Sequence, residues 1–148
     1  MTLRVDVQYA VGAERLPKPA DFQAWADAAM VDRTEAELVV RVVDRDESAR
    51  LNQTYRGKSD PTNVLSFPFD PPPQIESRLL GDLVICAPVV ADEARIQAKD
   101  LRSHWAHMLI HGILHLRGYE HETEQDAVEM ETREISIMTA LGFANPYK

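Results

Sequence analysis

The pattern of apolar and polar residues predicts four short β-strands. Residues 3–9 alternate the two kinds of side chain, which is the period-two pattern of a strand with one buried face. Short runs rich in β-branched and other apolar residues predict three more strands, at residues 37–43, 62–69 and 79–87. The run at 79–87 is the most apolar, so we expect it to lie in the centre of the sheet.

Helical periodicity and helix-ending residues predict five helices in the segments between and after the strands. Asp44 or Asp46 can cap the helix that follows the second strand, and Gly57 can end it. The glutamates of the last helix are expected to form a solvated face. The side chains of that helix expected to face inward are Val128, Ile135, Met138 and Leu141. The predicted helices cover residues 20–30, 47–55, 88–98, 101–117 and 122–141.

Two neighbouring residues interrupt the most apolar strand. Gly81 predicts a β-bulge or a close backbone approach. Asp82 is a polar residue among apolar neighbours, and a partly buried carboxylate needs partners. Two interpretations of Asp82 stay open. The carboxylate either bonds backbone amides or caps a turn, or it takes part in catalysis.

Length, charge and cysteine content limit the class of protein. A chain of 148 residues fits one domain, which we expect to span residues 1–148. One cysteine, the lack of a signal-peptide pattern and the lack of a transmembrane-length apolar run indicate a reducing, cytoplasmic setting. The net charge of -8 argues against non-specific nucleic-acid binding, which relies on basic surfaces.

Histidines are concentrated in one predicted helix and the turn after it. Of the five histidines, four lie between His107 and His121, and the fifth is His104. Residues four apart share a helix face and are separated by roughly 6 Å along the axis, so two imidazoles at this spacing can bind one metal ion. His107, His111 and His115 span about 12 Å, which is too far for one ion.

A ligand from outside the helix must therefore complete one histidine pair. Gly118 can end the helix by adopting positive φ, and the resulting turn can fold His121 back onto His111 and His115. These three histidines are the predicted metal ligands. The other two histidines are expected to be neighbours on the same helix face.

Three neutral imidazoles suit one Zn²⁺ ion per chain and leave a fourth position for water, as in catalytic zinc sites. Cys86, the only cysteine, is distant in sequence, which favours this open arrangement over a closed structural site. Affinities for first-row metals overlap, so another divalent metal remains an alternative. A further alternative is that the histidines pack on a half-buried helix and are satisfied by hydrogen bonds without metal.

Four motifs in chain order extend the argument beyond the histidines. They are residues 51–56 (L-N-Q-T-Y-R), 61–68 (P-T-N-V-L-S-F-P), 81–86 (G-D-L-V-I-C) and 111–121 (H-G-I-L-H-L-R-G-Y-E-H). Together they resemble the YbeY family of bacterial rRNA-maturation endoribonucleases, over about residues 35–142. Two departures are mild, because Glu120 and Asn63 stand where Asp is common and both keep hydrogen-bonding capacity.

The resemblance implies a fold, a metal and an activity. The fold is an α/β (α+β) single domain with a mixed four-stranded sheet, about five to six helices and a metalloprotease-like zinc helix. The metal is zinc on His111, His115 and His121. The activity is single-strand-specific RNA cleavage in 16S rRNA 3′-end maturation and ribosome quality control, with the ribosome or its small subunit and assembly factors as partners. Arg56 matches the family's functionally required arginine. On composition alone, the basic cluster of Arg50, Arg56 and Lys58 is explained as a solvated helix end.

The residue after the first predicted ligand distinguishes this motif from zinc proteases. Those enzymes carry Glu there as general base, whereas this chain has Gly112. We expect Arg56 to bind phosphate and zinc to act as Lewis acid. The base stays open among metal-activated water, His107 and Asp82, and we expect these two side chains and Glu120 beside the metal. The alternative functions are a zinc peptidase and a non-enzymatic ribosome-assembly factor with structural zinc.

Overall fold

The computed structural model describes residues 2–30, 35–74 and 77–148. In chain order its elements are β1 (Thr2–Tyr9), α1 (Pro19–Ala29), β2 (Glu35–Val43), α2 (Arg45–Arg56), β3 (Val64–Pro68), β4 (Leu79–Cys86), α3 (Ala87–Ile96), α4 (Leu101–Leu116) and α5 (Glu124–Ala140). Every predicted strand and helix is present, and the ends differ from the predicted ones by two residues at most. Within the described residues, no helix combines the length and hydropathy needed to cross a membrane.

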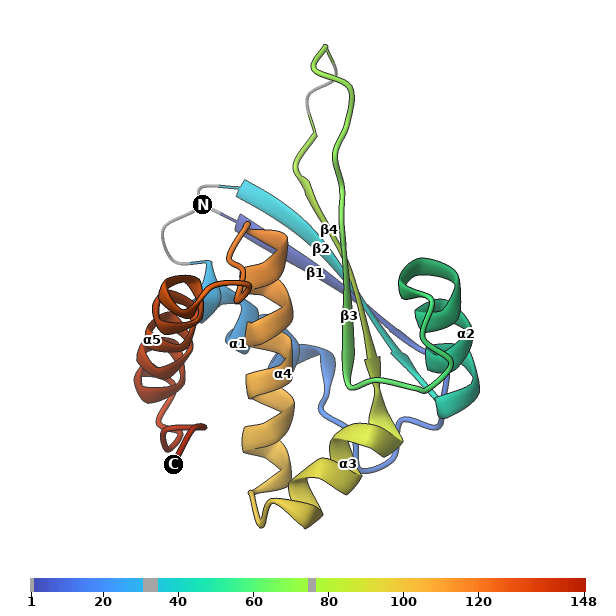
Figure 1. Ribbon diagram of the computed structural model, residues 1–148, viewed down its shortest axis with the longest axis vertical. Helices are drawn as coiled ribbons and strands as arrows, with labels where there is room; N and C mark the ends of the chain where they lie inside the picture. Colours follow the sequence, from blue (N-terminus) through green and yellow to red (C-terminus); the bar gives the residue numbers. More distant parts are fainter. Residues whose placement is uncertain (1, 31–34, 75–76) are drawn as a thin grey trace.

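The four strands form one mixed sheet in the order β1-β2-β4-β3. β1 pairs with β2 and β2 with β4 in parallel, whereas β3 and β4 are antiparallel. The α/β fold class is therefore confirmed, and the most apolar strand, β4, lies inside the sheet as predicted. Figure 1 shows α1, α4 and α5 grouped on one side of the sheet and α2 on the other.

Helix α4 is the central helix of the hydrophobic core. It packs against α1, α3 and α5 and against strands β3 and β4. Its fully buried side chains include Leu109, Ile110, Ile113 and Leu114. Burying a side chain of this kind contributes roughly 1.5–3 kcal/mol. The histidines of α4 are therefore carried by a helix that the core holds rigidly.

Gly81 allows strands β3 and β4 to approach closely. Its φ is +154°, and a Cβ atom there would lie 2.4 Å from the carbonyl oxygen of Phe67. The register between β2 and β4 shifts next to this residue. The predicted bulge and the predicted close approach are both present.

One inward-facing residue of the last helix was wrongly predicted. Val128 is 61% exposed. The buried stripe of α5 is formed by Met130, Glu134, Ile137 and Met138. Successive helical residues turn by about 100°, so Val128 lies on nearly the opposite side of the helix from Met130. The stripe also contains Glu134, whose carboxylate contacts histidines of α4.

Candidate metal centre

Helix α4 and the turn after it bring three histidines together. The Asp100 side chain caps the start of α4 by accepting a hydrogen bond from the Ser103 amide. The helix ends at Leu116, and Gly118 adopts a φ of +96°. The Tyr119 amide then bonds back to the Leu114 carbonyl at 2.9 Å. This helix-ending turn satisfies orphan carbonyl groups and reverses the chain towards the helix, as the sequence predicts.

The three imidazoles predicted as metal ligands converge. His111, His115 and His121 offer nitrogen atoms that all lie within 4.8 Å of one another. Nε2 of His111 lies 3.2 Å from Nε2 of His115. Two ligands of one tetrahedral zinc ion, each about 2.05 Å from the metal, are separated by roughly 3.3 Å. The donor set and its spacing fit a zinc ion.

The surroundings of His115 favour its neutral form, which is the form of imidazole that binds a metal ion. Burial, and next the neighbouring His111, lower the pKa of His115 below its usual value. Glu120 opposes this effect, with its Oε2 atom 3.6 Å from Nδ1 of His115. Glu120 therefore lies beside the candidate centre, as expected. Among the described residues, the ligand atoms grouped at this point come from the three histidines, so a zinc ion held here would keep a fourth position for water or substrate.

Glu134 is a member of this site that the sequence interpretation missed. Its side chain is 1% exposed, so the prediction that the glutamates of α5 form a solvated face is wrong for this residue. Its Oε2 atom contacts Nε2 of His107 and lies 3.3 Å from Nδ1 of His111. The available signal was its spacing of four residues from both Met130 and Met138, which places it on the buried stripe.

His104 belongs to a separate polar network at the other end of α4. Its Nε2 atom lies 2.9 Å from Oε1 of Glu93. The Asn63 side-chain amide donates to both oxygens of Glu93, at 3.2 and 3.1 Å. An aspartate at position 63 would instead oppose Glu93 with a second carboxylate. The asparagine at position 63 thus has a partner that suits it. Through Glu93, His104 is linked to Asn63 at the start of β3.

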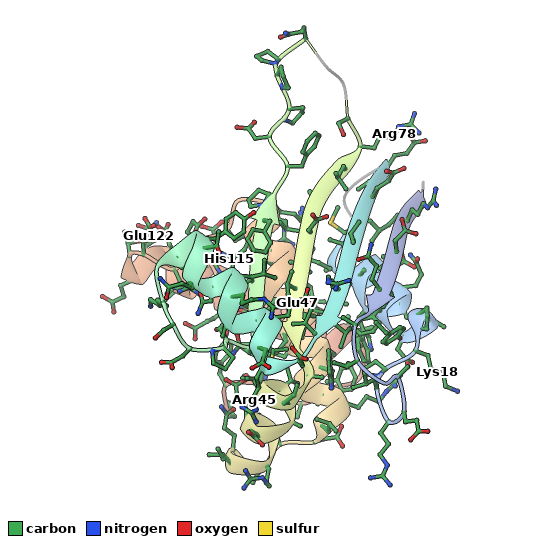
Figure 2. The ribbon with its side chains drawn as sticks, turned by 90° about the vertical axis from the view of Figure 1, so that its right-hand side faces the viewer. Lys18, Arg45, Glu47, Arg78, His115 and Glu122 are labelled. Atoms are coloured by element: carbon green, nitrogen blue, oxygen red, sulfur yellow. The ribbon has the colours of Figure 1, made fainter. Side chains whose placement is uncertain are left out.

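A cleft of about 1180 Å³ connects the histidines with α2. The walls of this cleft include Tyr55 and Arg56 of α2 together with His111, His115 and His121. Figure 2 looks onto the α2 side of the molecule and labels His115 and Glu47, which both line the cleft. The predicted phosphate-binding arginine and the predicted metal ligands thus face one cavity.

Local structure fixes the place of Arg56 in this cleft. Asp44 caps α2, as one of the two predicted caps, and Gly57 ends the helix with φ at +70°. The buried Asn52 side chain donates to the Asp60 carbonyl at 2.7 Å and so holds the following loop. Arg56 is exposed and has no ion-pair partner among the residues that the structure describes. Its guanidinium is available to an anion.

Asp82 was expected to be partly buried, and this expectation is wrong. It is exposed and lines the same cleft. Alternation along β4 directs Leu83 towards α4, where it is fully buried, and directs Asp82 to the opposite face. Its carboxylate therefore requires no buried partner.

Comparison with known proteins agrees with this arrangement. Residues 16–142 match the family described as Endoribonuclease YbeY. The solution structure of TM1509 from Thermotoga maritima is similar over 99% of both chains, with a TM-score of 0.60 and 23% sequence identity. At that identity the structural likeness concerns the fold. The family match includes Arg56 and the three converging histidines, and the chain belongs to the YbeY endoribonuclease family.

Proposed function

We propose that the protein is a zinc-dependent, single-strand-specific endoribonuclease that acts in 16S rRNA 3′-end maturation and ribosome quality control. Family membership supports, in general terms, a metal-dependent endoribonuclease role in rRNA processing. The observation that carries the proposal is the shared cleft, whose walls include Arg56 and three histidines with ligand spacing. The cytoplasm and the small ribosomal subunit are the proposed setting and partner.

His111, His115 and His121 are the proposed zinc ligands, with one ion per chain. A zinc ion bound there would supply Lewis acidity that polarises a phosphoryl oxygen and activates water or a neighbouring 2′-hydroxyl. The lowered pKa of His115 supports this role, because a neutral imidazole is the form that binds metal.

Arg56 is the proposed phosphate clamp. A guanidinium can donate two parallel hydrogen bonds to phosphate and stabilise the charge that develops during cleavage. Arg56 is exposed at the end of α2 and lines the cleft. A local cation of this kind offsets the acidic surface of a chain whose net charge is -8.

Tyr55 offers a surface for a base of single-stranded RNA. It is 64% exposed, lines the cleft, and makes an edge-to-face contact with the Phe67 ring at a centroid separation of 4.7 Å. Unpaired bases stack on exposed aromatic rings without needing a particular sequence. Together with Arg56, this ring would bind one nucleotide through its base and its phosphate.

The position of His107 argues against it as one of the three candidates for the general base. It is buried, and its Nε2 atom is engaged by Glu134. Asp82 faces the cleft and is the side-chain base that we retain in the proposal.

Peptide hydrolysis is disfavoured by the packing around Gly112. A Cβ atom at this position would lie 2.7 Å from Cδ2 of Leu83, so a glutamate here would point into the core of the fold. The position that carries the base in zinc proteases is here a glycine packed against Leu83. A purely structural zinc is disfavoured because the described residues offer three grouped ligands at this point, whereas structural zinc sites usually use four.

The test uses zinc-loaded protein with labelled single-stranded RNA, the matching duplex and casein, each with and without chelator. We expect cleavage of the single strand alone, loss of cleavage with chelator, and recovery when zinc is restored. Hydrolysis of casein would support the peptidase instead. RNA cleavage that is insensitive to chelator would contradict metal dependence.

A further inference from the structure

We propose that Glu134 is a positioning residue for the metal centre: its carboxylate orients the His111 ring, and Tyr147 and His107 hold that carboxylate in place. The inference rests on the proposed metal site and extends it to α5 and the C-terminal segment. It concerns a residue that touches neither metal nor substrate, and its effect is on metal affinity.

The network has one acceptor group and three donors. Oε2 of Glu134 contacts Nε2 of His107 and lies 3.3 Å from Nδ1 of His111. Oε1 of Glu134 accepts a hydrogen bond from the Tyr147 hydroxyl at 2.8 Å. Both carboxylate oxygens are therefore engaged, and the rotation of the carboxylate is fixed.

The two ring nitrogens of His111 face different partners. Nδ1 faces Glu134, while Nε2 faces His115 at 3.2 Å. A neutral imidazole carries one N–H group, and the acceptor at Nδ1 requires that group to be there. Nε2 is then left with its lone pair directed at the candidate metal position. A carboxylate that orients a ligating histidine through its second nitrogen is a common feature of metal sites.

The buried Glu134 carboxylate is surrounded by hydrogen-bond donors. Nε2 of His107, Nδ1 of His111 and the Tyr147 hydroxyl all reach its two oxygens. Nδ1 of His107 has no hydrogen-bond partner among the described residues, so the ring proton is needed on the Nε2 atom that donates to Glu134. The carboxylate therefore stays a pure acceptor.

The same three side chains of α4 and α5 could be taken for a second metal site. His107, His111 and Glu134 have ligand atoms within 4.8 Å of one another. Oε2 of Glu134, however, meets Nε2 of His107 directly, and the buried Nδ1 of His107 has no partner among the described residues, so the ring proton lies on Nε2. The contact is a hydrogen bond, which assigns Glu134 to orientation of His111.

Tyr147 connects this network to the C-terminal segment. Burial, and next the Glu134 carboxylate, raise the pKa of Tyr147, so its hydroxyl stays protonated as a donor. The Lys99 ammonium donates to the Pro146 carbonyl at 2.7 Å and anchors the segment beside α4. The Tyr147 ring also meets the His107 ring edge-on, at a centroid separation of 5.4 Å.

The test measures the zinc affinity of the full chain by competition with a chromophoric chelator. Outer-shell partners of ligating histidines typically contribute about 10–100-fold in metal affinity. We expect a loss in this range for Glu134→Gln and a smaller loss for Tyr147→Phe. The matched control is Glu129→Gln, on the exposed face of α5, which should bind zinc like the unchanged protein. Cobalt-loaded Glu134→Gln should also show a shifted visible absorption spectrum.

The outcomes separate this inference from the proposed function. If His111→Ala loses zinc while Glu134→Gln keeps full affinity, the metal site stands and the positioning role is wrong. If His111→Ala keeps zinc, the proposed metal site itself fails. Two zinc ions per chain, lost one at a time in Glu134→Gln, would show Glu134 to be a ligand. Should Glu134→Gln not fold, the zinc affinity of Tyr147→Phe decides, and an unchanged value overturns the inference.

Discussion

Oε2 of Glu134 lies 3.3 Å from Nδ1 of His111, although 23 residues separate them in the chain. The contact places α5 behind the histidines of α4, while the cleft opens in front of them towards α2. His111 thus has a polar neighbour at each ring nitrogen, Glu134 on one side and His115 on the other. The candidate metal centre therefore combines histidines of α4 and the turn after it with a glutamate of α5.

Replacing Arg56 by Ala should reduce RNA cleavage without removing the metal. Loss of one group that stabilises transition-state charge commonly lowers kcat by about 10²–10³-fold. Arg56→Lys should recover part of the activity, since it restores charge without the planar pair of donors. Rates are measured on zinc-loaded protein, with Arg50→Ala, an exposed arginine of the same helix, as control. Unchanged cleavage in Arg56→Ala would remove the phosphate clamp from the account.

Replacing Tyr55 by Ala should weaken binding of single-stranded RNA. A stacked base contributes about 1–3 kcal/mol, so the dissociation constant should rise by roughly 5–150-fold. Tyr55→Phe keeps the ring and should bind like the unchanged protein. Fluorescence anisotropy with a labelled oligonucleotide measures both. Equal affinities for the Ala and Phe variants would argue against stacking.

Replacing Gly81 by Ala should destabilise the fold. The φ of +154° is strained for a residue with a side chain, and the added methyl group would lie 2.4 Å from the Phe67 carbonyl oxygen. Strain of this kind costs about 1–3 kcal/mol. Gly12→Ala is the control, because a Cβ there meets nothing within 4 Å. Denaturant unfolding gives both free energies, and equal values would contradict the predicted clash.

The ion pair between Arg41 and Glu47 should make stability depend on pH in the acid range. Arg41 donates to both oxygens of Glu47, at 2.5 and 3.0 Å, and this bonding lowers the pKa of Glu47 although burial opposes it. The stabilisation is full above the ordinary pKa of 4.5 and is lost as the pH falls towards the lowered value.

The size of this effect is limited by solvent, because the Arg41 side chain is 38% exposed. We expect this pair to contribute about 0.5–1 kcal/mol to the change in unfolding free energy of metal-free protein between about pH 6 and pH 3. Glu47→Gln should reduce the pH dependence by that amount, whereas the exposed control Glu129→Gln should leave it unchanged. An identical pH dependence in Glu47→Gln would show that other groups cause it.

Local sequence patterns predict those parts of this fold that neighbouring residues determine. Period-two alternation, short apolar runs and helical periodicity locate every strand and helix, and Gly118 predicts the turn that returns His121 to the helix. These features depend on interactions within a few residues. The convergence of the three candidate ligands could therefore be predicted without knowledge of the tertiary structure.

Long-range contacts account for the features that were missed. Glu134 lies on a helix rich in exposed glutamates, and only its contact with α4 distinguishes it from them. The apolar neighbours of Asp82 in the sequence suggested that it is partly buried. In the sheet, however, the strand continues past the bulge with Asp82 facing the cleft. Which face of an element is covered depends on partners from distant segments, which single-sequence patterns do not contain.

The most direct measurement is zinc per chain and single-stranded RNA cleavage, determined on the same preparations of the unchanged protein and of His111→Ala. Exposure to chelator and later return of zinc complete the series. We predict one zinc ion per chain and chelator-sensitive cleavage for the unchanged protein, and neither for a folded His111→Ala. Undiminished cleavage by His111→Ala, or by protein stripped of metal, would contradict a metal-dependent site built on these histidines.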